Sequence, residues 1–307
     1  MRAFTAAAIQ LAPSPAPLTP ESISANCAKA ADWVARCVEA TGAELVVLPE
    51  SASTGFSPGC GPDELWDLVD AVPGALTEPL QEAARSTGAH VVWGTYERGP
   101  ERGVVFNSSV LVAPDGEVAG VYRKTHPFCT EIVSRGGWVT PGDEVCVVDT
   151  DLGRIGMAIC FDGDFPELWR IQAVLGAEVI VRPSALLRSA DIAEMTSRAR
   201  AYDNHVYVVA ANATGTDPGG THYFGNSHVV TPTSHTVARA ASHECWISAR
   251  LDPAEALASL TPGSSVAQGF DHLADRNLDL VRRYAAELAA PAATSFPYRR
   301  ARGDDRE

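Results

Sequence analysis

Residues 156–167 read GMAICFDGDFPE, and this stretch joins the end of a strand pattern to an abrupt turn. The apolar run ends at Cys160, and an Asp-Gly pair and then Pro166 follow within a few residues. Asp and Gly are typical of turns, and proline is favoured in the first turn of a helix. The sequence therefore predicts a strand, a tight turn that begins at the cysteine, and a helix over 166–175. A buried cysteine is often only a small hydrophobic residue, so a functional role for Cys160 needs support from elsewhere in the chain.

Apolar runs of strand type alternate with amphipathic segments along most of the chain. Predicted strands cover residues 4–11, 44–48, 90–96, 104–113, 117–123, 145–149, 154–160, 178–182, 206–211, 223–231, 235–240 and 245–251. Predicted helices cover residues 20–41, 77–86, 166–175, 192–203 and 277–288. This alternation, mixed with hairpins, predicts an α/β fold whose sheets are covered by helices.

The composition indicates a globular protein that can bury a large core. The chain has 307 residues, of which 46% are hydrophobic and 20% are charged. One large domain over residues 1–290 is expected, followed by a C-terminal tail, 291–307, that is partly disordered or involved in oligomer contacts. The irregular stretch from Lys124 to Asp143 is long enough to indicate a functional loop.

Charge and cysteine content argue against several classes of partner. Acidic residues outnumber basic ones by 38 to 24, and no run of Lys and Arg forms a nucleic-acid footprint, so nucleic acid and anionic membranes are not expected partners. No apolar stretch approaches the ~18 to 20 residues of a membrane span. The seven cysteines are odd in number and form no C-x-x-C pair, which favours a reduced, cytoplasmic protein.

Chemically useful residues follow three of the predicted strands. Glu50 follows LVVLP, Lys124 follows VAGVYR, and Cys160 follows RIGMAI. Loops at strand ends often carry function, because the scaffold can hold polar groups in a cleft. Each residue alone has an ordinary explanation, as a solvated carboxylate, a surface lysine or a buried thiol. Together they supply a nucleophile, a base for its proton, and a cation for a developing oxyanion.

Longer segments around these residues resemble a known family. LVVLPESASTGF, YRKTHPF and GMAICFDGDFPELWR are similar to the three signature regions of the nitrilase, or carbon-nitrogen hydrolase, superfamily, in the same order and at similar separations. AAAIQLAP, FNSSVLVAPDGEVAGVYRK, LGAEVIVRPSA, RARAYDNHVYVVAANATG and YFGNSHVVTP extend the resemblance to about residues 4–250.

The resemblance implies a four-layer α-β-β-α sandwich and a Glu-Lys-Cys triad. Cys160 is then expected to be the nucleophile, Glu50 the general base, and Lys124 an oxyanion donor together with the backbone N–H of Phe161. Many members carry a second glutamate in the loop after the lysine, and Glu131 is the candidate here, with a role in positioning substrate or water.

Two branches of the superfamily are represented in the finer details. CFDGDFPELWR and YFGNSHVV resemble amidases, whereas DHLADRNLDLVRRY resembles a segment of carbamoyl-amide hydrolases, and Ser51 stands where a large residue usually follows the glutamate. The expected reaction is hydrolysis of a small linear amide to a carboxylic acid and ammonia through a cysteine thioester. The alternatives are an N-carbamoyl-amide hydrolase of the ureidopropionase type, a nitrilase, and, more remotely, an inactive scaffold.

Family positions also indicate residues of the substrate pocket, namely Phe56, Phe128, Trp138, Arg182, Ser184 and Ala185. Phe56 and Trp138 are equally explained as core aromatics. Arg182 needs a partner, which is either a substrate carboxylate or a buried glutamate. No metal or organic cofactor is implied, since the eight histidines form no H-E-x-x-H motif or ligand cluster. The expected partners are a small amide and water, and a homodimer or higher homo-oligomer is expected by analogy.

Overall fold

The computed structural model describes residues 1–187, 189–254 and 271–290. The chain divides into two compact units, Met1–Gly269 and Phe270–Glu307. In the second unit, the predicted helix over 277–288 is interrupted at Tyr284, which separates α7 (Leu278–Arg283) from α8 (Ala285–Ala289). The domain boundary expected at residue 290 stays a prediction, and the predicted tail, 291–307, lies outside the described residues.

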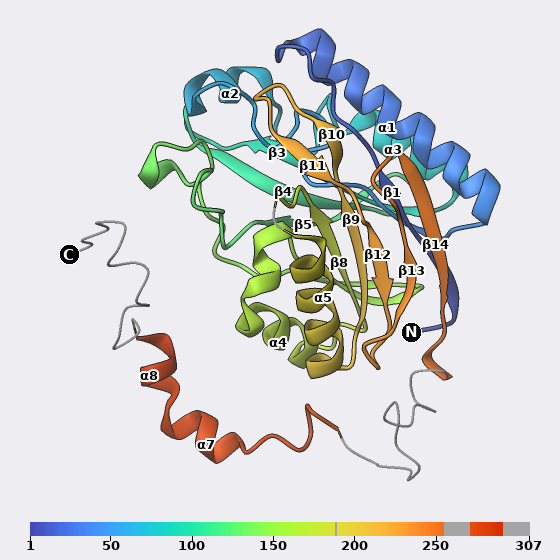
Figure 1. Ribbon diagram of the computed structural model, residues 1–307, viewed down its shortest axis with the longest axis vertical. Helices are drawn as coiled ribbons and strands as arrows, with labels where there is room; N and C mark the ends of the chain where they lie inside the picture. The colour runs from blue at the N-terminus through green and yellow to red at the C-terminus, as the bar shows by residue number, and fades with distance from the viewer. Residues whose placement is uncertain (188, 255–270, 291–307) are drawn as a thin grey trace. The chain divides into compact units, whose positions relative to one another are not determined.

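Two six-stranded sheets form the centre of the first unit (Figure 1). The first sheet has the spatial order β14 (Cys245–Leu251), β1 (Phe4–Gln10), β2 (Leu45–Val47), β3 (His90–Arg98), β4 (Val105–Val112) and β5 (Val118–Arg123). The second has the order β13 (Thr236–Arg239), β12 (His228–Val230), β9 (Tyr207–Asn212), β8 (Val179–Ser184), β7 (Gly153–Met157) and β6 (Val147–Thr150). A separate hairpin joins β10 (Thr214–Thr216) to β11 (His222–Phe224).

Helices cover the outer face of each sheet, which gives four layers. The long helices are α1 (Pro20–Thr41), α3 (Glu78–Thr87), α4 (Pro166–Val174) and α5 (Ala190–Asn204), and the short ones are α2 (Pro62–Leu68), η1 (Val133–Arg135) and η2 (Cys160–Asp164). α1 and α3 pack on the first sheet, α5 packs on the second beside α4, and the sheets meet through β1, β2, β3, β8 and β9. The first unit is therefore the expected α-β-β-α sandwich.

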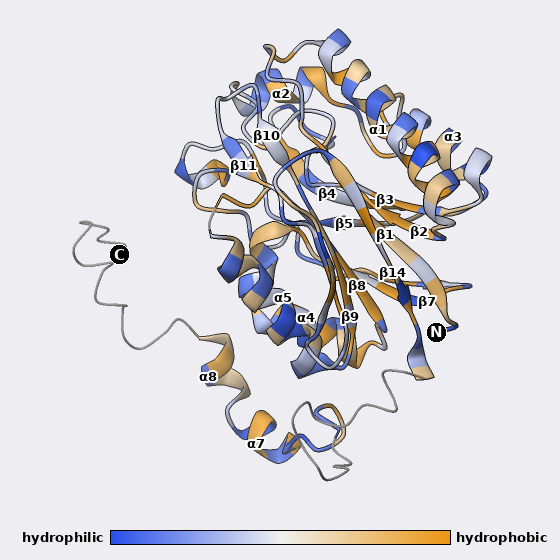
Figure 2. Ribbon diagram, turned by 45° about the vertical axis from the view of Figure 1, so that its right-hand side comes forward, coloured by the Kyte–Doolittle hydropathy of each residue, from blue (hydrophilic) through white to orange (hydrophobic). Residues whose placement is uncertain are grey.

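The central strands are apolar on both sides because both of their faces are covered. Every residue of β2, β8 and β9 is buried, and these strands run parallel to a neighbour in their sheet. Continuous hydrophobic runs are typical of such strands. Figure 2 shows the same contrast, with hydrophobic strands inside and helices of mixed character, such as α1, outside.

The first helix shows how local sequence sets an element's limits. Thr19 and Ser22 hydrogen-bond reciprocally as a capping box, and Pro20 occupies the first helical position. The helix ends at Gly42, whose φ of 65° is a left-handed conformation that glycine adopts at little cost. Within the described residues, no helix combines the length and the apolar character needed to cross a bilayer.

Some predicted boundaries were wrong. The strand predicted over 223–231 is two strands, β11 and β12, because Gly225 and Asn226 take left-handed backbone conformations between them. The strand predicted over 154–160 ends at Met157, and the β10–β11 hairpin and α2 were not predicted.

Candidate active site

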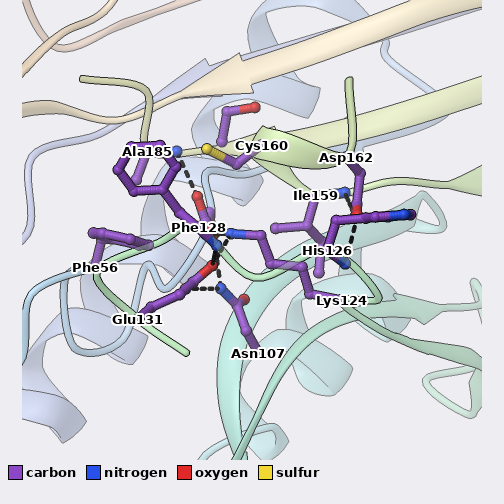
Figure 3. A network of polar contacts seen from close by, with 12 residues as sticks. Phe56, Asn107, Lys124, His126, Phe128, Glu131, Ile159, Cys160, Asp162 and Ala185 are labelled. Carbon is purple, nitrogen blue, oxygen red and sulfur yellow. Dashed lines mark hydrogen bonds and ion pairs between the residues drawn. The ribbon is translucent and has the colours of Figure 1, made fainter. Parts of the chain in front are cut away.

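Strands of both sheets bring the predicted residues together at their carboxyl ends. Glu50 follows β2, Cys160 follows β7, and Ala185 follows β8, while Lys124 comes directly after β5. In parallel α/β sheets, the carboxyl ends of strands are the usual place for a ligand crevice. Figure 3 shows Lys124, Cys160 and Ala185 around one small volume, although they come from distant parts of the sequence.

A buried ion cluster forms the polar side of this volume. The Nζ of Lys124 lies 2.7 Å from Oε1 of Glu50 and also hydrogen-bonds Oε1 of Glu131. All three side chains are fully shielded from solvent. The other oxygen of Glu50, Oε2, accepts a 2.8 Å hydrogen bond from the backbone N–H of Ala185. One cation thus serves two carboxyl groups, and each group has a fixed orientation.

Asn107 completes this cluster, and sequence reasoning missed it. Its Nδ2 donates to Oε1 of Glu50 at 2.7 Å and to Oε2 of Glu131 at 3.2 Å. Its Oδ1 is buried and has no hydrogen-bond partner among the described residues. The reverse amide orientation would place Oδ1 against two carboxylates, so the donor orientation is favoured. The available signal was a polar residue inside the FNSSV strand.

Burial and mutual charge set the protonation of the cluster. Burial lowers the pKa of Lys124, but the charges of Glu131 and Glu50 outweigh this effect and hold the pKa well above its usual value. Burial raises the pKa of Glu131 to about 7, with the neighbouring charge of Glu50 acting in the same direction against Lys124. The lysine therefore remains a cation at neutral pH.

Cys160 opens the turn η2 in a conformation that is unusual for a residue with a side chain. Its φ is 47°, in the left-handed region, which costs about 1 to 2 kcal/mol for a non-glycine residue. The thiol points toward the backbone N–H of Ala185 (Figure 3). Burial and the charge of Glu50 raise the pKa of the Cys160 thiol, so the resting group is protonated.

Asp162 anchors this turn to the strand that precedes Lys124. Its Oδ2 accepts from Ile159 N and from the hydroxyl of Tyr122, both at 2.8 Å, and its Oδ1 accepts from His126 N at 3.1 Å. In the sequence, Asp162 belongs to the Asp-Gly pair that is typical of a turn. The carboxylate does cap the turn, and it also joins the cysteine segment to the lysine segment.

An apolar pocket lies in front of the cysteine. Its lining comprises Phe56, Phe128, Cys160, Phe161, Ala185, Leu186 and Leu187. Of the six residues predicted to bind substrate, Phe56, Phe128 and Ala185 are in this lining. Phe56 also covers Lys124, whose Nζ lies 5.5 Å from the ring centroid. Leu186 and Leu187 were not predicted, because they follow the strand without any motif.

The other three predicted pocket residues lie elsewhere. Trp138 packs edge-on against Phe56, with ring centroids 6.0 Å apart, behind the lining. The hydroxyl of Ser184 donates back to the carbonyl of Arg182 at 3.1 Å. Arg182 is also absent from this lining, and its guanidinium donates to the carbonyl oxygen of Cys160.

Ligands for a metal ion do not gather in this region. Within the described part of the chain, no group of three His, Cys, Asp or Glu side chains has the arrangement of a metal site. The buried carboxyl groups of Glu50 and Glu131 instead share the lysine ammonium. The arrangement can therefore combine a thiol, a base and a cation for acyl transfer.

Comparisons with known proteins show the family of the chain. The sequence model of the carbon-nitrogen hydrolase family matches residues 5–258. The omega-amidase NIT2-A of Xenopus laevis is 31% identical over 220 residues, which cover 69% of this chain and 77% of the relative. A nitrilase of Pyrococcus abyssi is 36% identical over 205 residues, covering 66% and 74% respectively.

Among solved structures, a mutant of the Nesterenkonia AN1 amidase, from the nitrilase superfamily, has the same fold. It superposes with a TM-score of 0.74 and 25% identity over 92% of this chain and 97% of its own. A second neighbour, Nit3 of Saccharomyces cerevisiae, gives a TM-score of 0.73 with 26% identity over 85% and 96%. The chain therefore belongs to the carbon-nitrogen hydrolase family, whose members of this type hydrolyse carbon-nitrogen bonds other than peptide bonds.

Proposed function

We propose that this protein hydrolyses a small linear amide to a carboxylic acid and ammonia, with Cys160 as the nucleophile. The observation that carries the proposal is the position of the Cys160 thiol, between an apolar pocket and the buried cluster of Glu50 and Lys124. This arrangement provides space for an acyl group on one side of the sulfur and the groups for proton transfer on the other.

Attack begins with transfer of the thiol proton. Because burial keeps the pKa of the thiol high, the proton moves to Glu50 as the sulfur attacks the amide carbon. A C–S bond forms and the carbonyl electrons move to oxygen. Lys124 and the backbone N–H of Phe161 stabilise this oxyanion, a contribution worth about 3 to 4 kcal/mol for one donor.

Collapse of this intermediate releases ammonia. Glu50 returns the proton to the amide nitrogen, the C–N bond breaks, and a thioester remains on Cys160. A water molecule then loses a proton to Glu50 and attacks the thioester, which yields the carboxylic acid and the free thiol. Glu131 holds Lys124 and orients the water or the leaving nitrogen, supported by its contacts with Asn107 and the backbone of Phe128.

The pocket supports a short acyl group. The cavity in this lining is small, about 20 Å³, well below the ~300 to 1,000 Å³ typical of sites for drug-sized ligands. Its described lining is apolar or aromatic apart from the thiol. N-carbamoyl compounds and nitriles are the alternatives, and they differ from amides in their products.

The test is a panel of short amides, N-carbamoyl amino acids and nitriles, with ammonia and carbon dioxide quantified. Wild-type protein should release ammonia without carbon dioxide from an amide. Intact mass should detect an acyl adduct that is absent in Cys160→Ala. Cys129→Ala is the matched control, because that thiol is exposed and outside the pocket lining although its neighbour Phe128 is part of it. Activity that persists in Cys160→Ala would overturn the assignment, and carbon dioxide release would favour the carbamoyl alternative.

We also propose a homodimer or a higher homo-oligomer. Apolar side chains are exposed along α4 and α5, including Ile171, Val174 and Met195. Burial of such a face against a second copy would remove it from water. Light scattering of the wild type and of Val174→Glu tests this, with a smaller particle expected for the variant.

A further inference from the structure

A buried arginine hydrogen-bonds the turn that carries Cys160. Arg182, on β8, is 1% exposed, and its Nε and Nη2 donate to the carbonyl oxygen of Cys160 at 2.9 and 2.6 Å. Two charge-assisted hydrogen bonds from one planar fork fix both the position and the direction of their acceptor. The carbonyl of Cys160 therefore cannot rotate without losing both bonds.

The arginine is itself fixed from its other side. Its Nη1 lies 3.0 Å from Oγ1 of Thr196 and 3.0 Å from Oγ of Ser197, both on α5. β8 is hydrogen-bonded on both edges, between β7 and β9, so the backbone that carries the arginine is also held. The fork is thus a rigid support and not a flexible surface side chain.

Gly163 gives independent evidence for this close approach. A Cβ atom at Gly163 would lie 2.1 Å from Cζ and Nη2 of Arg182, far inside any ordinary contact distance. No side chain larger than hydrogen fits there while the guanidinium keeps its position. The glycine in the turn is therefore explained by the arginine that lies against it.

The planar peptide bond between Cys160 and Phe161 links the arginine contact to the pocket. The bond between Cys160 and Phe161 is trans, so its C=O and N–H point in opposite directions in one plane. Because Arg182 holds the carbonyl on one side of the turn, the N–H of Phe161 is directed to the other side, where Phe161 and Cys160 line the pocket. The left-handed φ of Cys160 is part of the same arrangement.

We propose that Arg182 is a positioning residue that orients the Cys160–Phe161 peptide, so that the N–H of Phe161 can donate to the oxyanion formed on the substrate. The inference rests on the proposed function, because it assigns a purpose within acyl transfer. It replaces the expectation that Arg182 binds a substrate carboxylate. The arginine acts through the peptide and does not touch the substrate.

The experiment separates acyl transfer from simple thiol reactivity. Arg182→Met and Arg182→Lys are compared with wild type for kcat and KM on propionamide, or on the panel amide that wild type hydrolyses fastest. In parallel, methyl methanethiosulfonate transfers its methylthio group to the Cys160 sulfur and releases methanesulfinate, a reaction without an oxyanion. The rate at Cys160 is followed by mass spectrometry of its peptide. Arg198→Lys is the matched control, since that guanidinium lies on the outside of α5 and contacts Ser234.

The expected result is a fall in kcat of about 10²-fold for Arg182→Met, with a smaller fall for Arg182→Lys, which keeps the charge but not the fork. KM and the methylthiolation rate should stay within about threefold of wild type, as loss of one oxyanion donor acts on the transition state alone. Equal losses in hydrolysis and methylthiolation, or no loss of kcat, would overturn the inference. An inactive wild-type protein would instead overturn the proposed function.

Discussion

The amide nitrogen of Asn107 lies 2.7 Å from Oε1 of Glu50, the same oxygen that accepts from Lys124. Asn107 also reaches Glu131, so two carboxyl groups and two donors form a closed ring of hydrogen bonds. A neutral donor can hold two buried carboxylates together without adding charge, and this ring orients the proposed base.

Replacement of this donor by an acceptor should therefore be costly. Asn107→Asp keeps the shape of the side chain but places a third carboxyl beside Glu50 and Glu131, and we expect kcat/KM to fall at least about 10²-fold. Ser108→Ala is the control, because the neighbouring Ser108 donates to Glu97 instead, at 2.6 Å. Ammonia release measures both variants. An active Asn107→Asp enzyme would show that the ring is not needed.

Lys124 is expected to have two separable functions, charge balance and oxyanion binding. Lys124→Met leaves Glu50 and Glu131 buried without their cation, so the free energy of unfolding should fall by about 3 to 5 kcal/mol. Addition of Glu131→Gln removes one carboxyl group and should restore part of that loss, as measured by urea denaturation. Hydrolysis should stay at least about 10²-fold below wild type in both variants. Recovery of activity in the double variant would show that Lys124 only balances the charge of the two glutamates.

Four residues of the site could be predicted because they lie in short sequence motifs. Glu50, Lys124 and Cys160 each follow a recognisable strand, and Glu131 is the glutamate in the loop after the lysine, so the family resemblance brought all four to attention. The structure places Glu50, Lys124 and Glu131 in one buried cluster and Cys160 beside it. Apolar runs without alternation predicted strands covered on both faces, whereas the four-layer arrangement was implied by the family resemblance.

Arg182 shows what such patterns leave out. Both faces of β8 are buried, so hydrophobic alternation does not reveal which side chains face the other sheet and which face α5. Arg182 contacts Thr196 and Ser197 of α5, whereas Ala185, only three residues later, lines the pocket. Asn107 was missed for a similar reason, because a polar residue in a strand has no local signal for the carboxylates that it meets.

Gly163 should not tolerate even the smallest side chain. In Gly163→Ala, the new Cβ meets the guanidinium of Arg182, which has no free direction in which to move. We expect a loss of about 1 to 3 kcal/mol in the free energy of unfolding. The variant should also lose more hydrolysis than Cys160 methylthiolation. Gly61→Ala is the control, since nothing lies within 4 Å of a Cβ there. Similar behaviour of the two variants would contradict the close approach.

The aromatic side of the pocket should limit acyl length. Phe128 lines the pocket and packs edge-on against Phe161, so Phe128→Ala should enlarge the space beside the thiol. We expect the ratio of kcat/KM for hexanamide over propionamide to rise about 10-fold or more, within the ~1 to 3 kcal/mol that pocket contacts provide. Trp138 lies outside the lining, so Trp138→Phe should leave this ratio unchanged. An unchanged ratio in Phe128→Ala would place the acyl group elsewhere.

His228 should make the protein sensitive to acid. Its side chain is buried in β12, its Nδ1 lies 2.9 Å from the carbonyl of Asn226, and its Nε2 has no hydrogen-bond partner among the described residues. Burial, with the charge of Arg182 acting in the same direction, lowers the pKa of His228 from 6.5 to about 4. Between these values the unfolded chain binds a proton that the folded chain does not, so stability falls as pH decreases from 6.5 toward 4.

The size of this effect and its test follow from the same two values. The difference between 6.5 and about 4 corresponds to about 3 kcal/mol of stability, fully present above pH 6.5 and lost near pH 4. In His228→Gln the side chain at this position cannot titrate. As the pH decreases over this range, the free energy of unfolding should therefore fall more in the wild type than in the variant, by about that amount. Urea denaturation at a series of pH values measures the difference, with His243→Gln as the control, because His243 is exposed. Parallel pH curves for wild type and His228→Gln would show that protonation of this histidine does not oppose folding.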